Sequence, residues 1–144
     1  MNLEKAIEIA VKAHQGQKDK FGAPYIGHIM RVMNMGRTDE EKICGVLHDI
    51  VEDTDWTFEQ LAAEGFSPTI IEALRCVTKL SEEEDYEHFV QRTLQNRLAC
   101  LVKINDLTDN MDVRRIPEVT EKDIPRFNKY LKAYRTIASA LANS

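Results

Sequence analysis

The sequence predicts an all-α protein, folded as a single bundle of about seven or eight helices. Three observations support this fold class. Apolar residues recur at three- and four-residue steps through most of the chain, as they do in amphipathic helices. Helix-start signals, such as threonine three residues before glutamate or serine directly before proline, precede several of these segments. No segment alternates apolar and polar residues for long, so no sheet is predicted.

Two helices are predicted on either side of a polar loop near the start of the chain. Residues 2–15 carry apolar side chains at helical spacing, and Gly16 interrupts that pattern. The loop at residues 17–23 is polar and contains a second glycine. Pro24 suits the first turn of a helix, and the apolar residues after it predict a helix to about Met35.

Two capping boxes mark the next helix starts. Thr38 followed by Glu41 predicts the start of a helix that continues into residues 45–54. Thr57 followed by Gln60 predicts a short helix over residues 58–63, which a glycine stops.

Serine residues mark two further starts in the second half of the chain. The serine–proline pair at residues 67–68 predicts a helix over about residues 69–78. Ser81 with Glu84 predicts another, which runs to about Leu94.

Two long periodic segments complete the predicted bundle. Residues 98–107 form the first, and residues 121–142 form the last helix. The inner face of that last helix is expected to carry Phe127, Tyr130, Leu131, Tyr134, Ile137 and Leu141.

Length and charge limit the classes of protein that the chain can represent. A chain of 144 residues has the size of one domain, so residues 1–144 are expected to share a single core. Its hydrophobic share of 43% and charged share of 30% are those of a globular protein that folds in water. A net charge of −5 argues against a general nucleic-acid binder, although it leaves room for an anionic small molecule held by local cations.

The cysteines and the chain start point to the cytoplasm. Cys44, Cys76 and Cys100 are odd in number and widely spaced among apolar neighbours, so we expect reduced core residues. The first residues lack the basic start and apolar run of a signal peptide. No segment approaches the roughly 20 apolar residues of a membrane span. The sequence leaves the oligomeric state open.

Residues 45–54 combine the pattern of a buried helix with one imidazole and three carboxylates. At about 100° per residue, His48 lies one turn from Glu52 and Asp49 lies one turn from Asp53, so the four share one flank. Three neighbouring carboxylates repel one another, and negative charge is unfavourable at a helix C-terminus. A bound cation would remove most of that cost. The alternative is a helix end whose acidic residues simply face water.

Two other positions are candidates to complete a metal site. His28 lies on a mostly apolar helix, where a lone histidine is more often a hydrogen-bonded core residue than a ligand. Asp106 interrupts an apolar run, with Asn110 one turn further on the same face. A buried aspartate needs a partner, which a metal, a helix cap or an ion pair would each provide.

These residues resemble a family pattern. The chain resembles the HD-domain superfamily of metal-dependent phosphohydrolases, and more closely the hydrolase domain of the RelA/SpoT homologues in its stand-alone small alarmone hydrolase form. The resemblance covers the chain from His14 to about Tyr134. It rests on His14 with Gln17, on Pro24-Tyr25-Ile26 before His28, on the run Leu47-His48-Asp49-Ile50-Val51-Glu52-Asp53-Thr54, on Val77-Thr78-Lys79, and on Leu101-Val102-Lys103-Ile104-Asn105-Asp106 with Asn110.

The resemblance implies a ligand set and a pair that activates water. One divalent metal, usually Mn²⁺, would be held by His28, His48, Asp49 and Asp106. The same ligands suit Zn²⁺ or Fe²⁺, so they do not fix the identity of the metal. Glu52 and Asp53 match the family residues that position and deprotonate the attacking water.

The family reaction removes the 3′-pyrophosphate from guanosine tetraphosphate or pentaphosphate (ppGpp or pppGpp), the alarmones of the stringent response. The products are GDP or GTP and pyrophosphate. Two alternatives stay open. The chain would act on another phosphorylated nucleotide, such as a 2′- or 3′-phosphorylated dinucleotide, or would be a non-catalytic nucleotide-binding module. Retention of the water-activating pair favours an enzyme over a binding module.

Six residues are expected to contact the substrate. They are Lys18, Lys20 and Lys103 for the phosphates, Asn110 beside the substrate, and Arg126 and Tyr130 facing the nucleotide. The alternative for the last two is an exposed arginine and a core tyrosine. The chain also departs from the family pattern, because its loop after Gln17 is shorter, Asp19 adds a negative charge there, and Gly27 replaces an asparagine.

Overall fold

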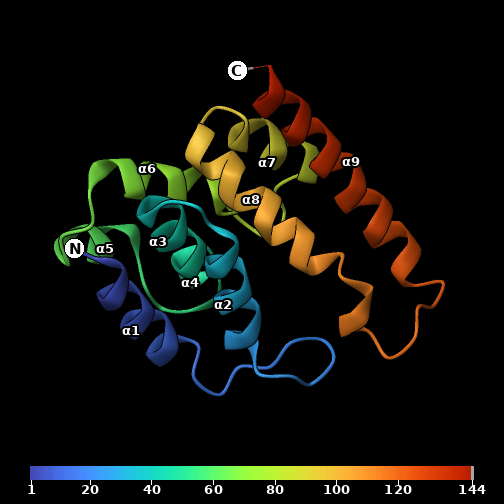
Figure 1. Ribbon diagram of the computed structural model, residues 1–144, viewed down its shortest axis with the longest axis horizontal. Helices are drawn as coiled ribbons and strands as arrows, with labels where there is room; N and C mark the ends of the chain where they lie inside the picture. The colour runs from blue at the N-terminus through green and yellow to red at the C-terminus, as the bar shows by residue number, and fades with distance from the viewer. Residues whose placement is uncertain (144) are drawn as a thin grey trace.

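The computed structural model describes residues 1–143, which fold almost entirely as helices (Figure 1). In chain order the helices are α1 (Leu3–Ala13), α2 (Tyr25–Met35), α3 (Asp39–Leu47), α4 (Ile50–Asp53), α5 (Phe58–Ala63), α6 (Pro68–Val77), α7 (Tyr86–Thr93), α8 (Arg97–Asn110), a 3-10 turn η1 (Val113–Arg115) and α9 (Asp123–Ala142). Residues 1–143 contain no strand, and one isolated antiparallel bridge joins Lys18 to Pro24. The all-α prediction is confirmed.

The predicted helix through residues 45–54 is in fact two helices, α3 and α4. The chain turns at His48 and Asp49, where Asp49 has φ −105° and ψ 1°. The ring Nδ1–H of His48 donates to the Gly45 carbonyl at 2.6 Å. In a continuous helix that carbonyl would accept from the Asp49 N–H. The prediction of one helix was therefore wrong, and the break aims His48 and Asp49 differently from the residues of α4.

One of the two predicted capping boxes forms completely, and the other forms only in part. Thr57 and Gln60 form a complete box at the start of α5. Thr38 caps α3 by accepting from the Glu41 N–H at 3.1 Å, but the Glu41 carboxylate accepts from the Arg37 N–H instead of returning to Thr38. The helix start at Thr38 was predicted correctly. The second bond of the predicted box, from the Thr38 N–H to the Glu41 carboxylate, does not form.

The predicted helix start at Ser81 is wrong. Helix α7 begins at Tyr86, with Asp85 as its N-cap. Glu84 does not serve as a capping residue, because its carboxylate accepts two hydrogen bonds from the Arg92 guanidinium, both at 2.8 Å. Residues 78–85 therefore form a loop between α6 and α7, and this loop borders the site described below.

Helix α8 runs through the middle of the bundle and belongs to two apolar clusters (Figure 1). It contributes Ala99 and Val102 to a cluster with α1, α2, α3 and α6. It contributes Cys100 and Leu107 to a second cluster with α7 and α9. Because α8 has neighbours on both sides, its polar residues Lys103 and Asp106 are buried as well.

The inner face of α9 was predicted in part. Ile137 is fully buried, but Leu131 is 39% exposed, which contradicts its predicted place on that face. Ala133, whose small side chain gave little periodic signal, packs into the second cluster instead.

The cysteines and the membrane prediction can also be compared with the structure. Cys44 and Cys100 are buried, Cys76 is partly buried, and all three thiols are free. Among residues 1–143, no helix combines the length and the apolar character that a membrane crossing needs.

Gly45 sits where α3 passes close to α2, which gives a first prediction. An added Cβ would lie 3.2 Å from the Met33 Cα and 3.3 Å from the Val32 carbonyl oxygen, and neither backbone atom can move alone. We expect Gly45→Ala to lower the free energy of unfolding by about 1–3 kcal/mol, measured by urea denaturation. In the control Gly27→Ala on α2, the Cβ meets only the flexible end of Arg31. Equal stability of the two variants would contradict this reading.

Candidate active site

The four predicted metal ligands form one buried cluster. His28 comes from α2, His48 and Asp49 from the turn between α3 and α4, and Asp106 from α8. One donor atom from each lies within 4.8 Å of the other three. The Nε2 atoms of His28 and His48 lie 3.0 and 3.2 Å from Asp106 Oδ1, and His48 Nε2 lies 3.1 Å from Asp49 Oδ2.

Both histidines are held through the nitrogen that faces away from the cluster. The Gly45 carbonyl can only accept, so neutral His48 carries its proton on Nδ1 and leaves the Nε2 lone pair toward the cluster. His28 is held by Asp109, whose Oδ2 lies 2.6 Å from the His28 Nδ1. Partners of this kind orient metal-binding histidines in proteins. The donor set and its orientation therefore fit a single divalent cation.

The two carboxylates of the cluster are also oriented by neighbours. Asp106 accepts from the Lys103 ammonium at 2.9 Å and from the Asn110 amide at 3.1 Å. Asp49 accepts a hydrogen bond from the Tyr25 hydroxyl. Burial alone would raise the pKa of Asp106, but Lys103 and the two histidines hold it well below its usual range. Asp106 is therefore ionised at neutral pH, as the predicted role of metal ligand requires.

Lys103 lies beside the cluster rather than in the open pocket. The Lys103 side chain is buried. Its ammonium lies 4.9 Å from the centre of the Phe89 ring and donates a hydrogen bond to Asp106. Burial would lower the pKa of Lys103, but Asp106 raises it overall. The charge of Lys103 is thus paired with the Asp106 carboxylate.

The surroundings of Glu52 and Asp53 disfavour the charged forms of both carboxylates. Burial and the repulsion from Asp49 raise the pKa of Glu52. Burial, Asp49 and Glu52 together raise the pKa of Asp53 to about 6. Glu52 is tethered by the Lys79 backbone N–H at 3.1 Å, and the Asp53 carbonyl accepts from the Gln17 amide at 3.0 Å. With a pKa of about 6, the Asp53 carboxylate can take up a proton near neutral pH.

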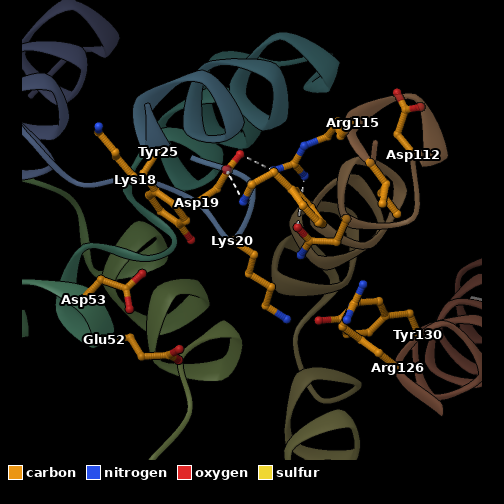
Figure 2. Close-up of a pocket in the computed structure, with 13 residues that line it drawn as sticks. Lys18, Asp19, Lys20, Tyr25, Glu52, Asp53, Asp112, Arg115, Arg126 and Tyr130 are labelled. Carbon is orange, nitrogen blue, oxygen red and sulfur yellow. Dashed lines mark hydrogen bonds and ion pairs between the residues drawn. The ribbon is translucent and has the colours of Figure 1, made fainter. Parts of the chain in front are cut away.

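A pocket of about 400 Å³ opens in front of this acidic pair (Figure 2). Glu52 and Asp53 form one wall of it, and positive side chains approach from the other side (Figure 2). Of the six predicted substrate contacts, the five that line this pocket are Lys18, Lys20, Asn110, Arg126 and Tyr130. Phe21 and Ile116 add apolar surface. The pocket combines the groups needed to hold phosphates with a surface for a nucleobase.

Asp19 does not place an unpaired negative charge among those cations. Its Oδ1 accepts from the backbone N–H groups of Phe21 and Ala23 at 2.9 and 3.0 Å, which fixes the shortened loop. Its Oδ2 accepts from the Arg115 guanidinium at 3.2 Å. The departure from the family pattern is thus neutralised by an arginine that sequence reasoning did not consider.

Sequence reasoning also missed Asp109. Besides His28, its carboxylate accepts from Arg31 at 2.7 Å and from Arg115 at 3.0 Å, and it is almost fully buried. It lies three residues after Asp106 on α8, close to the same face of the helix. That spacing was a usable signal, because a second acidic residue on a buried face needs a partner.

Comparison with known proteins finds similar sequences among guanosine-polyphosphate hydrolases and GTP pyrophosphokinases. It is 31% identical over 120 residues to the guanosine-3′,5′-bis(diphosphate) 3′-pyrophosphohydrolase of Aquifex aeolicus, covering 76% of this chain and 17% of that protein. It is 34% identical over 160 residues to the GTP pyrophosphokinase of Myxococcus xanthus, covering 99% of this chain and 21% of that protein. The chain thus spans about a fifth of the length of these curated relatives. No family model matches the sequence.

A solved structure supports the same grouping at the level of the fold. It is described as a metazoan ortholog of SpoT that hydrolyses ppGpp and plays a role in starvation responses. The two share a TM-score of 0.75 and 24% identity over 96% of this chain and 84% of the other. The chain is a relative of the RelA/SpoT-type hydrolases. The predicted resemblance is confirmed, and the helical fold of residues 1–143 is similar to that of the metazoan protein.

The Asp109–His28 contact yields a second prediction. We expect Asp109→Asn to weaken Mn²⁺ binding by roughly 10- to 100-fold, because loss of the carboxylate frees the His28 ring to rotate. Isothermal titration of the metal-depleted protein measures the affinity, and circular dichroism checks the fold. The control Asp112→Asn alters a carboxylate whose partners within residues 1–143 are the exposed Arg114 side chain and its backbone N–H. Equal affinities of the two variants would contradict the assigned role of Asp109.

The raised pKa of Asp53 yields a third prediction, for the metal-free protein. Because its folded pKa of about 6 exceeds the ordinary value of 3.8, folding is penalised increasingly as pH rises through that interval. We expect Asp53→Asn to raise the free energy of unfolding above about pH 7 by up to about 1 kcal/mol, allowing for solvent screening. The gain should vanish below about pH 3, where Asp53 is protonated in both the folded and the unfolded state. Urea denaturation in EDTA measures this change in the free energy of unfolding. The control is Asp55→Asn, at an exposed position. Equal gains in both variants would refute the prediction.

Proposed function

We propose that the chain is a metal-dependent hydrolase that removes the 3′-pyrophosphate of guanosine tetraphosphate or pentaphosphate. The observation that carries the proposal is a buried cluster of two histidines and two aspartates beside the acidic pair Glu52 and Asp53. The pocket cations supply the charge that a polyphosphate needs. The names of the relatives in Aquifex aeolicus and of the metazoan structure, both hydrolases of this nucleotide, support the choice of substrate.

The proposed cofactor is one divalent ion, Mn²⁺ in the first place, with Zn²⁺ and Fe²⁺ as the other ions that this ligand set suits. It would be held by His28, His48, Asp49 and Asp106. When bound, such an ion polarises a phosphoryl oxygen and lowers the pKa of water.

Glu52 and Asp53 are proposed to orient the attacking water and take its proton. A general base works best when its pKa lies near the working pH, and the pKa of Asp53 is raised toward that range. The Lys79 N–H holds the Glu52 carboxylate, and Gln17 holds the backbone of Asp53, which reduces the ordering needed during the reaction.

The outer pocket is proposed to bind the nucleotide. Lys18, Lys20 and Arg126 would neutralise the 5′-phosphates, and Asn110 would contact the substrate beside Asp106. Tyr130, with its partly buried ring, would face the nucleoside. The fixed loop around Asp19 keeps these cations in place before substrate arrives.

The fourth prediction concerns the reaction itself. Purified protein with Mn²⁺ is expected to release pyrophosphate and GDP from guanosine tetraphosphate, and EDTA is expected to abolish the activity. Both products should be quantified by chromatography and by separate assays for pyrophosphate and inorganic phosphate. Release of inorganic phosphate would instead favour a phosphatase acting on another nucleotide.

Two variants separate the metal-binding role from the role in activating water. Asp49→Ala should lose bound metal and activity together, because it removes a ligand. Glu52→Ala should retain the metal but lose roughly 100-fold or more in kcat. Normal turnover by Glu52→Ala, with metal still bound, would refute the assignment of that residue.

A further inference from the structure

The Glu52 carboxylate is held by a loop that lies elsewhere in the sequence. Glu52 belongs to α4, which has four residues, and so short a helix depends on tertiary contacts. Among residues 1–143, the Glu52 carboxylate accepts one hydrogen bond, from the Lys79 N–H at 3.1 Å. Lys79 lies just after α6, at the start of the loop that leads to α7. The direction of the Glu52 side chain therefore depends on how firmly this loop is held.

Arg92 of α7 holds both ends of this loop, residues 78–85. Its guanidinium donates to the carbonyls of Arg75 and Thr78 at 3.1 and 2.8 Å, where α6 ends. Carbonyl groups at the end of a helix lack helical partners and favour a positive charge. The same guanidinium donates two hydrogen bonds of 2.8 Å to the Glu84 carboxylate, near the end of the loop. One side chain thus joins the end of α6 to the far part of the loop.

The peptide group between Thr78 and Lys79 links Arg92 to Glu52. No peptide bond within residues 1–143 is cis, so the C=O and the N–H of this planar group point in opposite directions. Its carbonyl, from Thr78, accepts from Arg92. Its N–H, from Lys79, donates to Glu52. Because Arg92 holds the carbonyl, the plane of the peptide group is fixed and its N–H is aimed at the carboxylate.

Glu84 holds the next peptide group. Its Oε1 accepts from the Leu80 N–H at 2.9 Å, so the peptide groups on both sides of Lys79 are bound. The side chains of Arg92 and Glu84 are 19% and 5% exposed, and ion pairs so far removed from solvent are screened little by salt. The Arg92–Glu84 pair therefore fixes the backbone on both sides of the residue that holds Glu52.

We propose that Arg92 and Glu84 are positioning residues that act on the reaction through Glu52. This inference rests on the proposed function, in which Glu52 orients the attacking water. The pair keeps the Glu52 carboxylate in the pocket wall before substrate binds (Figure 2). Neither Arg92 nor Glu84 lines that pocket or belongs to the predicted ligand cluster. Their loss should therefore change turnover, and not the binding of nucleotide or metal.

The test uses two variants of the pair and one control. Arg92→Met removes the guanidinium and keeps an unbranched side chain on α7. Glu84→Gln keeps the shape of Glu84 and removes its charge, and it carries the same test if circular dichroism shows that Arg92→Met does not fold. The control Lys132→Met breaks the exposed pair of Lys132 with Glu87, which joins α9 to α7 and lies outside the loop.

We expect Arg92→Met to lower kcat for guanosine tetraphosphate by roughly 10- to 50-fold, and Glu84→Gln by roughly 3- to 10-fold. KM and the affinity for Mn²⁺ should stay within about 3-fold of the parent protein in both variants. Lys132→Met should keep kcat within about 2-fold. A loss confined to KM, or an unchanged kcat in both variants of the pair, would overturn the proposal.

A double-mutant cycle decides whether the loss acts through Glu52. In the Glu52→Ala protein there is no carboxylate for the Lys79 N–H to hold. Adding Arg92→Met or Glu84→Gln to that protein should therefore lower the residual kcat by less than about 2-fold. A loss of the same size with and without the Glu52 carboxylate would overturn the proposal, because Arg92 would then act by another route.

Amide hydrogen exchange, followed by NMR, separates this inference from the proposed function. In the metal-depleted protein, the Lys79 amide should exchange roughly 5- to 10-fold faster in Arg92→Met than in the parent protein, and at the parent rate in Lys132→Met. If the parent protein does not hydrolyse the nucleotide, the proposed function fails, while the exchange rate still decides whether Arg92 holds the Lys79 amide on Glu52. Equal exchange of this amide in the parent protein and in Arg92→Met would overturn the positioning role.

Discussion

The site depends on bringing Asp106 of α8 against the turn between α3 and α4. Two carboxylates and two imidazoles meet there, and each has a partner that fixes its direction. The partners are Lys103 for Asp106, Tyr25 for Asp49, Asp109 for His28 and a backbone carbonyl for His48. Isolated buried charges of this kind would cost several kcal/mol each, so the cluster exists only because these contacts compensate for the desolvation. Central placement of α8, between two apolar clusters, makes that arrangement possible.

The break between α3 and α4 directs four neighbouring polar residues into two different surroundings. In one continuous helix, His48 and Glu52 would project along the same line, as would Asp49 and Asp53. The turn at residues 48–49 lets His48 and Asp49 enter the cluster while Glu52 and Asp53 form the pocket wall. The proposed metal ligands His48 and Asp49 and the proposed water-activating pair thus come from adjacent residues but face different surroundings.

Local signals in the sequence predicted much of the fold and the ligand cluster. Apolar periodicity and helix caps located eight helical segments, and Asp106 stood out as an acidic residue in an apolar run. The break at Asp49 could not be predicted, because it depends on a side-chain bond to the Gly45 carbonyl rather than on glycine or proline. Leu131 was misplaced because periodicity marks a face of α9 but not where neighbouring helices end.

Partners distant in sequence were the hardest part to predict. Asp19 reads as a misplaced negative charge until Arg115, 96 residues later, is seen to bind it. Once that pair is formed, the pocket has an ordered charge pattern, with acids beside the metal cluster and cations around the rest. This pattern is one reason for the proposed substrate. A nucleotide phosphorylated at its 3′ and 5′ positions would place phosphates at both the cluster and the outer cations, whereas a single phosphate would reach only one of them.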